Sequence, residues 1–128
     1  MRLLLDTHAL LWWWTNDKQL SSAARAAIAD ERHAVLVSAA SVWEISTKYR
    51  LGKLAMAAVA LAQFQSLIEA DGFEHLPITW PHSLRAGAYP QEHRDPFDRM
   101  LAAQSELEQA RLVTCDSAFD AFNTSVLW

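Results

Sequence analysis

Four acidic residues of this 128-residue chain either follow short apolar runs or fall near the starts of expected helices. They are Asp6, Glu44, Asp98 and Asp116. Carboxylate oxygens are the ligands that hard divalent cations such as Mg²⁺ and Mn²⁺ take in proteins. If the fold brings the four side chains together, they form a pocket for such a cation. The pattern then predicts a metal-dependent enzyme that acts on phosphate esters.

Each acid also has a purely structural interpretation. Asp6 precedes the first expected helix and Asp116 the last one, so either side chain would cap a helix. Glu44 completes the spacing Ser-x-x-Glu of a capping box that starts at Ser41, and it lies four residues before Lys48. Only convergence of the carboxylates in space therefore distinguishes a metal pocket from a set of helix caps.

The segment around Asp98 contains a second acid. Asp95 is followed by Pro96, which is the pattern of a cap with proline at the first helical position. Asp98 then occupies the third helical position, where a carboxylate interacts favourably with the helix dipole. Either carboxylate of this segment is available to a cation.

Strands and helices are expected to alternate along the chain. Short apolar runs predict strands at 3–5, 34–37, 73–76 and 112–114, with a last short strand at 125–128. Helices are predicted at 9–14, 21–30, from 38 or 41 to about 51, 55–70, 81–88, 96–110 and 117–122. This alternation predicts an α/β fold, a three-layer sandwich whose central, mainly parallel sheet is flanked by helices. Ligands of such sheets bind beyond the carboxyl ends of the strands, where Asp6 and Asp116 would lie.

The composition limits the class of protein. The chain is 52% hydrophobic and 20% charged, which predicts one globular domain spanning residues 1–128. Its formal net charge of -4 provides no overall basic field, so a nucleic acid would be held by local basic residues and bound metal. The single cysteine, Cys115, excludes an intramolecular disulfide. Because Asp6 and His8 interrupt the first apolar stretch, we expect a cytoplasmic protein without a membrane span.

Several other side chains have two interpretations. Basic side chains near the acids would either hold substrate phosphates or remain solvated on the surface. They are Lys48, Arg50, Lys53, Arg94 and Arg99. His93 would approach a substrate or pack locally, and Cys115 is expected to be a small core residue. The three consecutive side chains Trp12–Trp14 span too wide a helical arc to face one core, which predicts that at least one meets solvent or a partner.

The chain resembles the PIN-domain ribonucleases, specifically the VapC-type toxins of type II toxin–antitoxin systems. The resemblance covers essentially the whole chain. It rests on LLLDTHALLWW at the start, VSAASVWEISTKYRLGKL in the middle, and HRDPFDRMLAAQ followed by LVTCDSAF near the end. Each segment is weak by itself, and the set is specific in order and spacing.

This resemblance implies a PIN-like fold and a set of functions. The family's acidic quartet falls on Asp6, Glu44, Asp98 and Asp116, which are then the catalytic and metal-binding residues. The pattern Asp-x-x-Leu-Ala-Ala selects Asp98 rather than Asp95 as the ligand. Members of the family bind Mg²⁺ or Mn²⁺ at these positions and cleave RNA. The resemblance also implies a homodimer that is silenced by a cognate VapB-like antitoxin.

Two alternative functions follow from the residues alone. One is another Mg²⁺-dependent phosphatase or phosphoryl-transfer domain, whose acids also lie at strand ends. Asp6-Thr7-His8 lacks the Asp-x-Asp pair of one common phosphatase class. The other alternative is a catalytically silent α/β binding module in which every acid is a helix cap.

Overall fold

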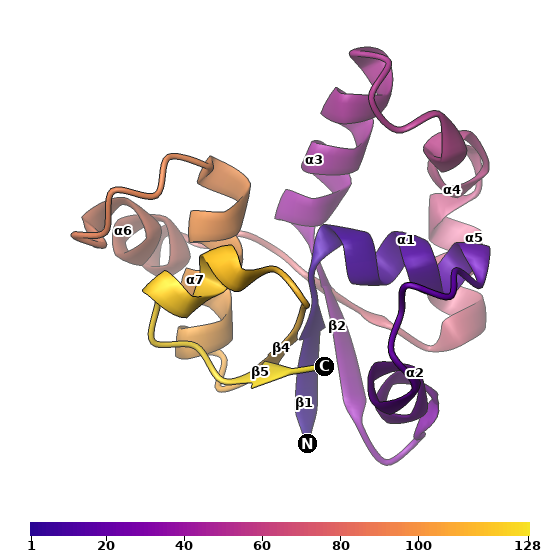
Figure 1. The fold of residues 1–128 in the computed structure, drawn as a ribbon, viewed down its shortest axis with the longest axis horizontal. Coiled ribbons are helices and arrows are strands. Elements are labelled where there is room, and N and C mark those ends of the chain that lie inside the picture. The colour runs from indigo at the N-terminus through magenta and orange to yellow at the C-terminus, as the bar shows by residue number, and fades with distance from the viewer.

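A five-stranded parallel sheet forms the centre of the computed structural model, which describes all residues 1–128 (Figure 1). Its strands follow the order β3-β2-β1-β4-β5, and every neighbouring pair is parallel. The strand bounds are β1 Arg2–Leu5, β2 Ala34–Ser38, β3 Glu74–Leu76, β4 Arg111–Val113 and β5 Val126–Leu127. The central strands consist of apolar runs because both faces of the sheet are covered by helices. The predicted three-layer α/β sandwich is confirmed.

The helices form two layers, one on each face of the sheet (Figure 1). Their bounds are α1 Thr7–Thr15, α2 Ser22–Ala29, α3 Ala39–Arg50, α4 Ala58–Ala62, α5 Phe64–Asp71, α6 Trp80–Ala88 and α7 Pro96–Leu107. Two short 3₁₀ helices complete the chain, η1 Ala55–Ala57 and η2 Ser117–Ala121. Helix α3 extends beyond the end of β2, past the carboxyl edge of the sheet (Figure 1).

The alternation of side chains along β1 divides the core into two clusters. Leu3 and Leu5 belong to the cluster that includes the buried residues of α1 and α2. Leu4 points to the opposite face and joins Leu36 and Leu112 in the cluster that includes α7. Successive residues of a strand point to opposite faces, so one run of three leucines supplies both cores.

Two details of the predicted helices are wrong. The predicted helix 55–70 is divided into η1, α4 and α5, with a break at Gln63, whose backbone leaves the helical region at φ −120°. Helix α3 is capped by Ser38, whose side chain accepts a hydrogen bond from the Ala40 amide, so no capping box starts at Ser41. Glu44 therefore lies in the second helical turn, and the fully buried Ser41 hydroxyl has no hydrogen-bond partner.

The three consecutive tryptophans all pack partly against the same core cluster. Trp12 stacks edge-on against Trp128, whereas Trp14 stacks edge-on against Phe64 of α5. The indole nitrogens of Trp13 and Trp14 both donate to Asp71, over 3.1 Å and 2.8 Å. The prediction that the three rings cannot pack against one core is wrong, because elements from both ends of the chain close around α1. The prediction that at least one ring meets solvent is confirmed, because all three are only partly buried.

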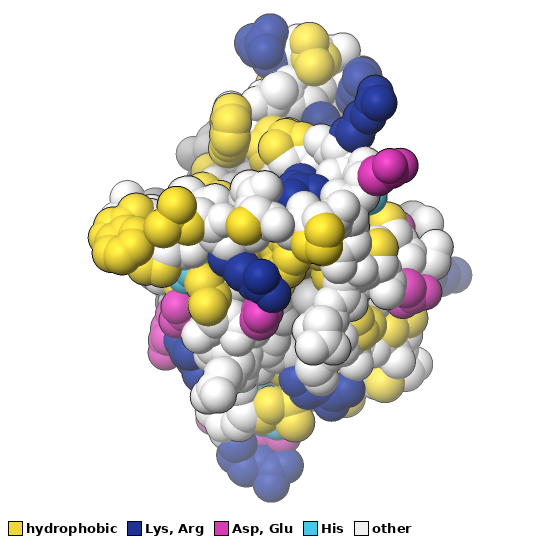
Figure 2. All heavy atoms as spheres, turned by 90° about the vertical axis from the view of Figure 1, so that its left-hand side faces the viewer, with side chains coloured by type: hydrophobic (Ala, Val, Ile, Leu, Met, Phe, Trp, Pro, Cys, Tyr) yellow, Lys and Arg dark blue, Asp and Glu magenta, His cyan; other side chains and the backbone are white.

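The surface carries charges of both signs. Figure 2 shows a face on which Lys and Arg side chains are interspersed with Asp and Glu, and from which apolar side chains project. The most exposed large apolar residues of α6 are Trp80 and Leu84. No helix of the structure combines the length and apolar character needed to cross a membrane.

Candidate metal centre

The pairing of β1 with β4 places two of the predicted acids side by side. Leu5 and Val113 are partners in the parallel register, and the amide of Asp6 donates a 3.1 Å hydrogen bond to the carbonyl oxygen of Val113. Asp116 follows Val113 by three residues. The order of strands reverses between β1 and β4, which is the position where parallel sheets place their ligands.

The other two acids come from helices that pack against each other. Glu44 lies on α3, and Asp98 lies in the first turn of α7. Asp95 caps α7 through Oδ1, which accepts hydrogen bonds from the amides of Phe97 and Asp98, over 2.9 Å and 3.1 Å. The predicted cap at Asp95 and the predicted third helical position of Asp98 are both present.

All four acids line one small pocket. Its volume is about 60 Å³, and its lining contains a fifth carboxylate and one lysine. The lining residues are Asp6, Thr7, His8, Glu44, Lys48, Asp95, Asp98, Leu101 and Asp116. Four segments that are far apart in the sequence therefore contribute carboxylates to the same space.

The structural interpretations of Asp6 and Asp116 also hold. Asp6 Oδ1 accepts a 2.7 Å hydrogen bond from the amide of Ala9 and caps α1. Asp116 Oδ1 accepts a 2.9 Å hydrogen bond from the amide of Ala118 and caps η2. A cap uses one carboxylate oxygen and fixes the direction of the side chain. Capping and clustering are thus compatible, and the caps hold two acids at the pocket.

Glu44 and Asp98 are bound by other side chains of the pocket region. Glu44 is buried, with Oε1 accepting a 2.5 Å hydrogen bond from Thr7 Oγ1 and Oε2 paired with the ammonium group of Lys48. Asp98 Oδ2 lies 2.8 Å from Nε2 of His93. His93 thus has the locally packed position, one of its two predicted roles, and its pairing with Asp98 depends on a loop conformation that no sequence motif indicates.

Burial raises the pKa of two of these carboxylates, those of Asp6 and Asp98. Desolvation raises the pKa of Asp6, and hydrogen bonds from Thr114 and from the amide of Ala9 only partly offset the effect. Desolvation also raises the pKa of Asp98 to about 6, against the lowering effect of the His93 hydrogen bond. The neighbouring charges of Asp95 and Glu44 raise the Asp98 pKa further. A cation in the pocket would favour the ionised form of both groups.

The donor set of the pocket fits a hard divalent cation by its chemistry. Its acids offer oxygen ligands only, which suits Mg²⁺ or Mn²⁺. No three His, Cys, Asp or Glu side chains converge on one point in metal-ligating geometry. Glu44 and Asp98 are turned toward Lys48 and His93 instead, so they would have to exchange these partners to hold an ion.

Five of the other candidate residues have structural or surface positions. Arg99 donates hydrogen bonds to backbone carbonyls of the segment between α6 and α7, so its guanidinium is engaged in the fold. Arg94, Arg50 and Lys53 are exposed. Cys115 is exposed as well, so the prediction that it is a core residue is wrong: it lies in the connection that follows the buried end of β4.

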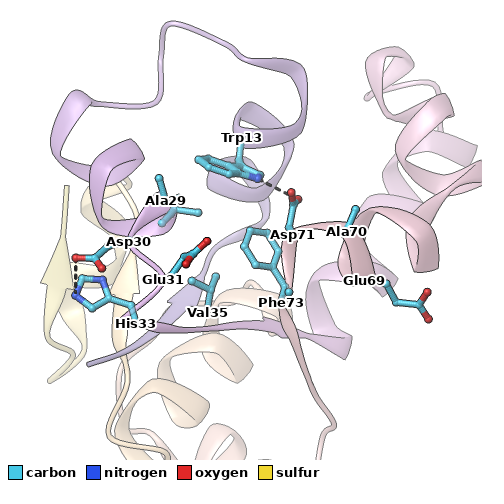
Figure 3. Close-up of a pocket in the computed structure, with 12 residues that line it drawn as sticks. Trp13, Ala29, Asp30, Glu31, His33, Val35, Glu69, Ala70, Asp71 and Phe73 are labelled. Atoms are coloured by element: carbon cyan, nitrogen blue, oxygen red, sulfur yellow. Dashed lines mark hydrogen bonds and ion pairs between the residues drawn. The ribbon is translucent and has the colours of Figure 1, made fainter.

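The largest cavity of the molecule lies elsewhere. It has a volume of about 580 Å³ and is lined by residues of α1, α2, the start of β2 and the end of α5 (Figure 3). Its acids include Asp30, which contacts His33, and Asp71, which accepts from the indole of Trp13 (Figure 3). Asp30 is also paired with Arg32. None of the four predicted acids lines this cavity.

Comparisons with known proteins agree with the fold and extend over nearly the whole chain. A sequence model of the PIN domain matches residues 3–124. The chain is 33% identical over 117 residues to Ribonuclease VapC22 of Mycobacterium tuberculosis (strain ATCC 25618 / H37Rv), covering 89% of this chain and 86% of that protein.

Solved structures show the same fold at low sequence identity. A structure of VapBC2 from Rickettsia felis bound to a DNA fragment from their promoter has a TM-score of 0.62 at 17% identity, covering 100% of this chain and 98% of that chain. A structure of FitAB bound to the IR36 DNA fragment has a TM-score of 0.56 at 19% identity, covering 99% of this chain and 94% of that chain. With the family match over residues 3–124, these findings show that the chain belongs to the PIN domain family.

Proposed function

We propose that this chain is a Mg²⁺- or Mn²⁺-dependent endoribonuclease toxin of the VapC type, formed by one domain over residues 1–128. Asp6, Glu44, Asp98 and Asp116 are its catalytic and metal-binding residues. The observation that carries the proposal is the single pocket that these four carboxylates line, at the switch point of the sheet. The ribonuclease name of a relative with 33% identity supports the activity.

The chain's own residues contribute position and electrostatics to this reaction. Asp6 and Asp116 are directed by their capping hydrogen bonds, so little side-chain freedom is lost when they act. Glu44 and Asp98 approach from α3 and α7. A bound divalent ion would neutralise phosphate charge and acidify a water molecule at this point. Because the net charge is -4, the RNA is held locally rather than by a basic surface.

We further propose a cognate VapB-like antitoxin and a homodimer as the partners, in the cytoplasm. The support is that similar folds were solved as VapBC2 and as FitAB, and as a toxin–antitoxin complex from Klebsiella pneumoniae at a TM-score of 0.55 and 16% identity. That complex covers 98% of this chain and 96% of its own chain. A pull-down with the product of a small neighbouring reading frame tests this part separately.

The activity is tested by RNA cleavage with Mg²⁺ or Mn²⁺, comparing wild type with Asp6→Asn and Asp98→Asn. The matched control is Asp120→Asn, which changes an exposed acid outside the pocket. We expect a loss of roughly 100-fold or more in the two pocket variants and wild-type activity in the control, because the pocket carboxylates act only through the bound ion.

Equal activity of all four proteins, with or without metal, would contradict the metal mechanism. The alternative of a silent binding module predicts no cleavage and no difference in Mn²⁺ binding between wild type and Asp6→Asn. Hydrolysis of a phosphate monoester without cleavage of RNA would favour the phosphatase alternative. Membership of the PIN domain family argues against both alternatives.

A further inference from the structure

Lys48 is the one lysine or arginine that lines the carboxylate pocket. Its ammonium group contacts Oε2 of Glu44, four residues earlier on α3. The Glu44 side chain is only 5% exposed, whereas the Lys48 side chain is 31% exposed. The pocket is thus lined by five carboxylates and a single permanent cation. This cation contacts Glu44, the buried carboxylate that α3 contributes.

The contact uses an oxygen that a metal ion would need. Glu44 Oε1 is already engaged by the hydroxyl of Thr7 at 2.5 Å, and Oε2 is engaged by Lys48. A divalent ion on Oε2 would lie next to the ammonium group, and two cations at that separation repel each other strongly in a poorly solvated site. The ion and Lys48 therefore compete for the same oxygen.

Lys48 carries a charge, unlike the hydrogen-bond donors that hold Asp6 and Asp116. Asp6 and Asp116 accept from neutral donors only, namely the amides of Ala9 and Ala118 and, for Asp6, also the hydroxyl of Thr114. Glu44 is instead held by a charged group on a flexible four-carbon stem that is partly exposed. Such a stem allows the ammonium group to move toward solvent without any change in the backbone of α3.

Resting on the proposed metal-dependent function, we propose that Lys48 is a built-in counter-ion that holds Glu44 in the metal-free protein and is displaced from it by the divalent cation. Lys48 is then a positioning residue that acts through Glu44. Removing its charge leaves Glu44 buried without a cation, which destabilises the metal-free protein. The same change removes the competitor and tightens metal binding.

The test is a Mn²⁺ titration of wild type, Lys48→Met and Lys48→Gln, followed by calorimetry or by the paramagnetic resonance signal of free Mn²⁺. Lys53→Met is the matched control, because Lys53 is exposed, lies outside the pocket and follows the same helix. We expect both Lys48 variants to bind Mn²⁺ about tenfold more tightly than wild type and the control to bind like wild type. Lys48→Gln keeps a hydrogen-bond donor for Glu44, so it supplies the answer if Lys48→Met fails to fold.

A second measurement separates this role from a purely structural one. The melting temperature of both Lys48 variants should lie below that of the control in chelator, and the difference should vanish in saturating Mn²⁺. A structural salt bridge would lower the melting temperature in both conditions and leave Mn²⁺ affinity unchanged or weaker.

The outcomes distinguish this inference from the proposed function. If wild type binds Mn²⁺, Asp98→Asn does not, and the Lys48 variants bind no more tightly than wild type, the counter-ion role is overturned and the metal site stands. If wild type itself binds no Mn²⁺, the proposed function fails and the counter-ion role fails with it.

Discussion

Nη2 of Arg99 donates a 2.7 Å hydrogen bond to the carbonyl oxygen of Tyr89, across the connection between α6 and α7. The same guanidinium also donates to the carbonyl oxygens of Ala86, Gln91 and His93. One side chain in the first turn of α7 thus fixes the segment that delivers His93 to Asp98. The planar fork of five donors in arginine is what this arrangement requires.

We therefore expect Arg99→Lys to destabilise the protein although it keeps the charge. A lysine has one ammonium group and cannot reach carbonyls on several sides, which leaves half-buried acceptors without donors. The expected loss is about 2–4 kcal/mol in the free energy of unfolding, measured by urea denaturation. Arg94→Lys is the control, since Arg94 is exposed, and it should change the same quantity by less than about 0.5 kcal/mol. Equal losses of unfolding free energy in the two variants would contradict the role of Arg99 in fixing the connection between α6 and α7.

Ser38 supports α3 in two ways at once. Its hydroxyl group accepts a 3.0 Å hydrogen bond from the amide of Ala40 and donates a 2.5 Å hydrogen bond to Oε1 of the fully buried Gln104. Ser38→Ala should cost about 2–3 kcal/mol of unfolding free energy, because it removes a cap and leaves a buried acceptor unpaired. Ser21→Ala removes only the cap of α2 and should cost about 1 kcal/mol. Thermal unfolding of the two variants, compared at one pH, would reject this account if their losses were alike.

The raised pKa of Asp98 predicts how the stability of the chelator-treated protein changes with pH. Its pKa is about 6 in the folded chain against 3.8 for an ordinary aspartate, so the native state holds the proton more tightly than the unfolded state. The protonated Asp98 carboxyl therefore makes its full contribution to the free energy of unfolding below pH 3.8, and this contribution is lost as the pH rises through about 6. Asp98→Asn should not show this loss. The free energy of unfolding of the variant, relative to that of wild type, should therefore rise by on the order of 1–2 kcal/mol as the pH is raised from 4.5 to 7.5.

Denaturation of both proteins over this pH range provides the measurement. His93 contacts Asp98, so the same comparison in a His93→Gln background separates the contribution of the imidazole from that of the carboxyl. A constant difference between Asp98→Asn and wild type at every pH would contradict the raised pKa.

Metal binding should depend on pH for the same reason. A cation at Asp98 has to displace the proton that this group retains up to its pKa of about 6. The Mn²⁺ affinity of wild type should therefore rise about fivefold from pH 5 to 6 and level off above pH 7. Titration calorimetry in buffers of different ionisation enthalpy would detect the released proton. An affinity that does not vary over this range would show that Asp98 is ionised before the ion binds.

Local patterns in the sequence were sufficient to predict the strands and most of the helices, and to select four acids as candidate ligands. The apolar run Leu3–Leu5 predicted a buried strand, and Asp6 and Asp95 predicted helix caps that the structure contains. These features depend on neighbours within about four residues, through side-chain alternation and capping hydrogen bonds. The parallel order of the strands then brought Asp6 and Asp116 to the same edge of the sheet.

Other features depended on contacts between distant segments, which no local pattern encodes. Tertiary packing alone decided the break at Gln63, the exposure of Cys115 and the role of Arg99 as a backbone clamp. It also decided that Asp6 and Asp116 are both caps and members of one pocket, and that the partly exposed Lys48 side chain lies beside five carboxylates. The sequence by itself determined which oxygens are available for a cation. The tertiary structure decided which partners hold them, because burial and charge at the pocket arise only when four separate segments meet.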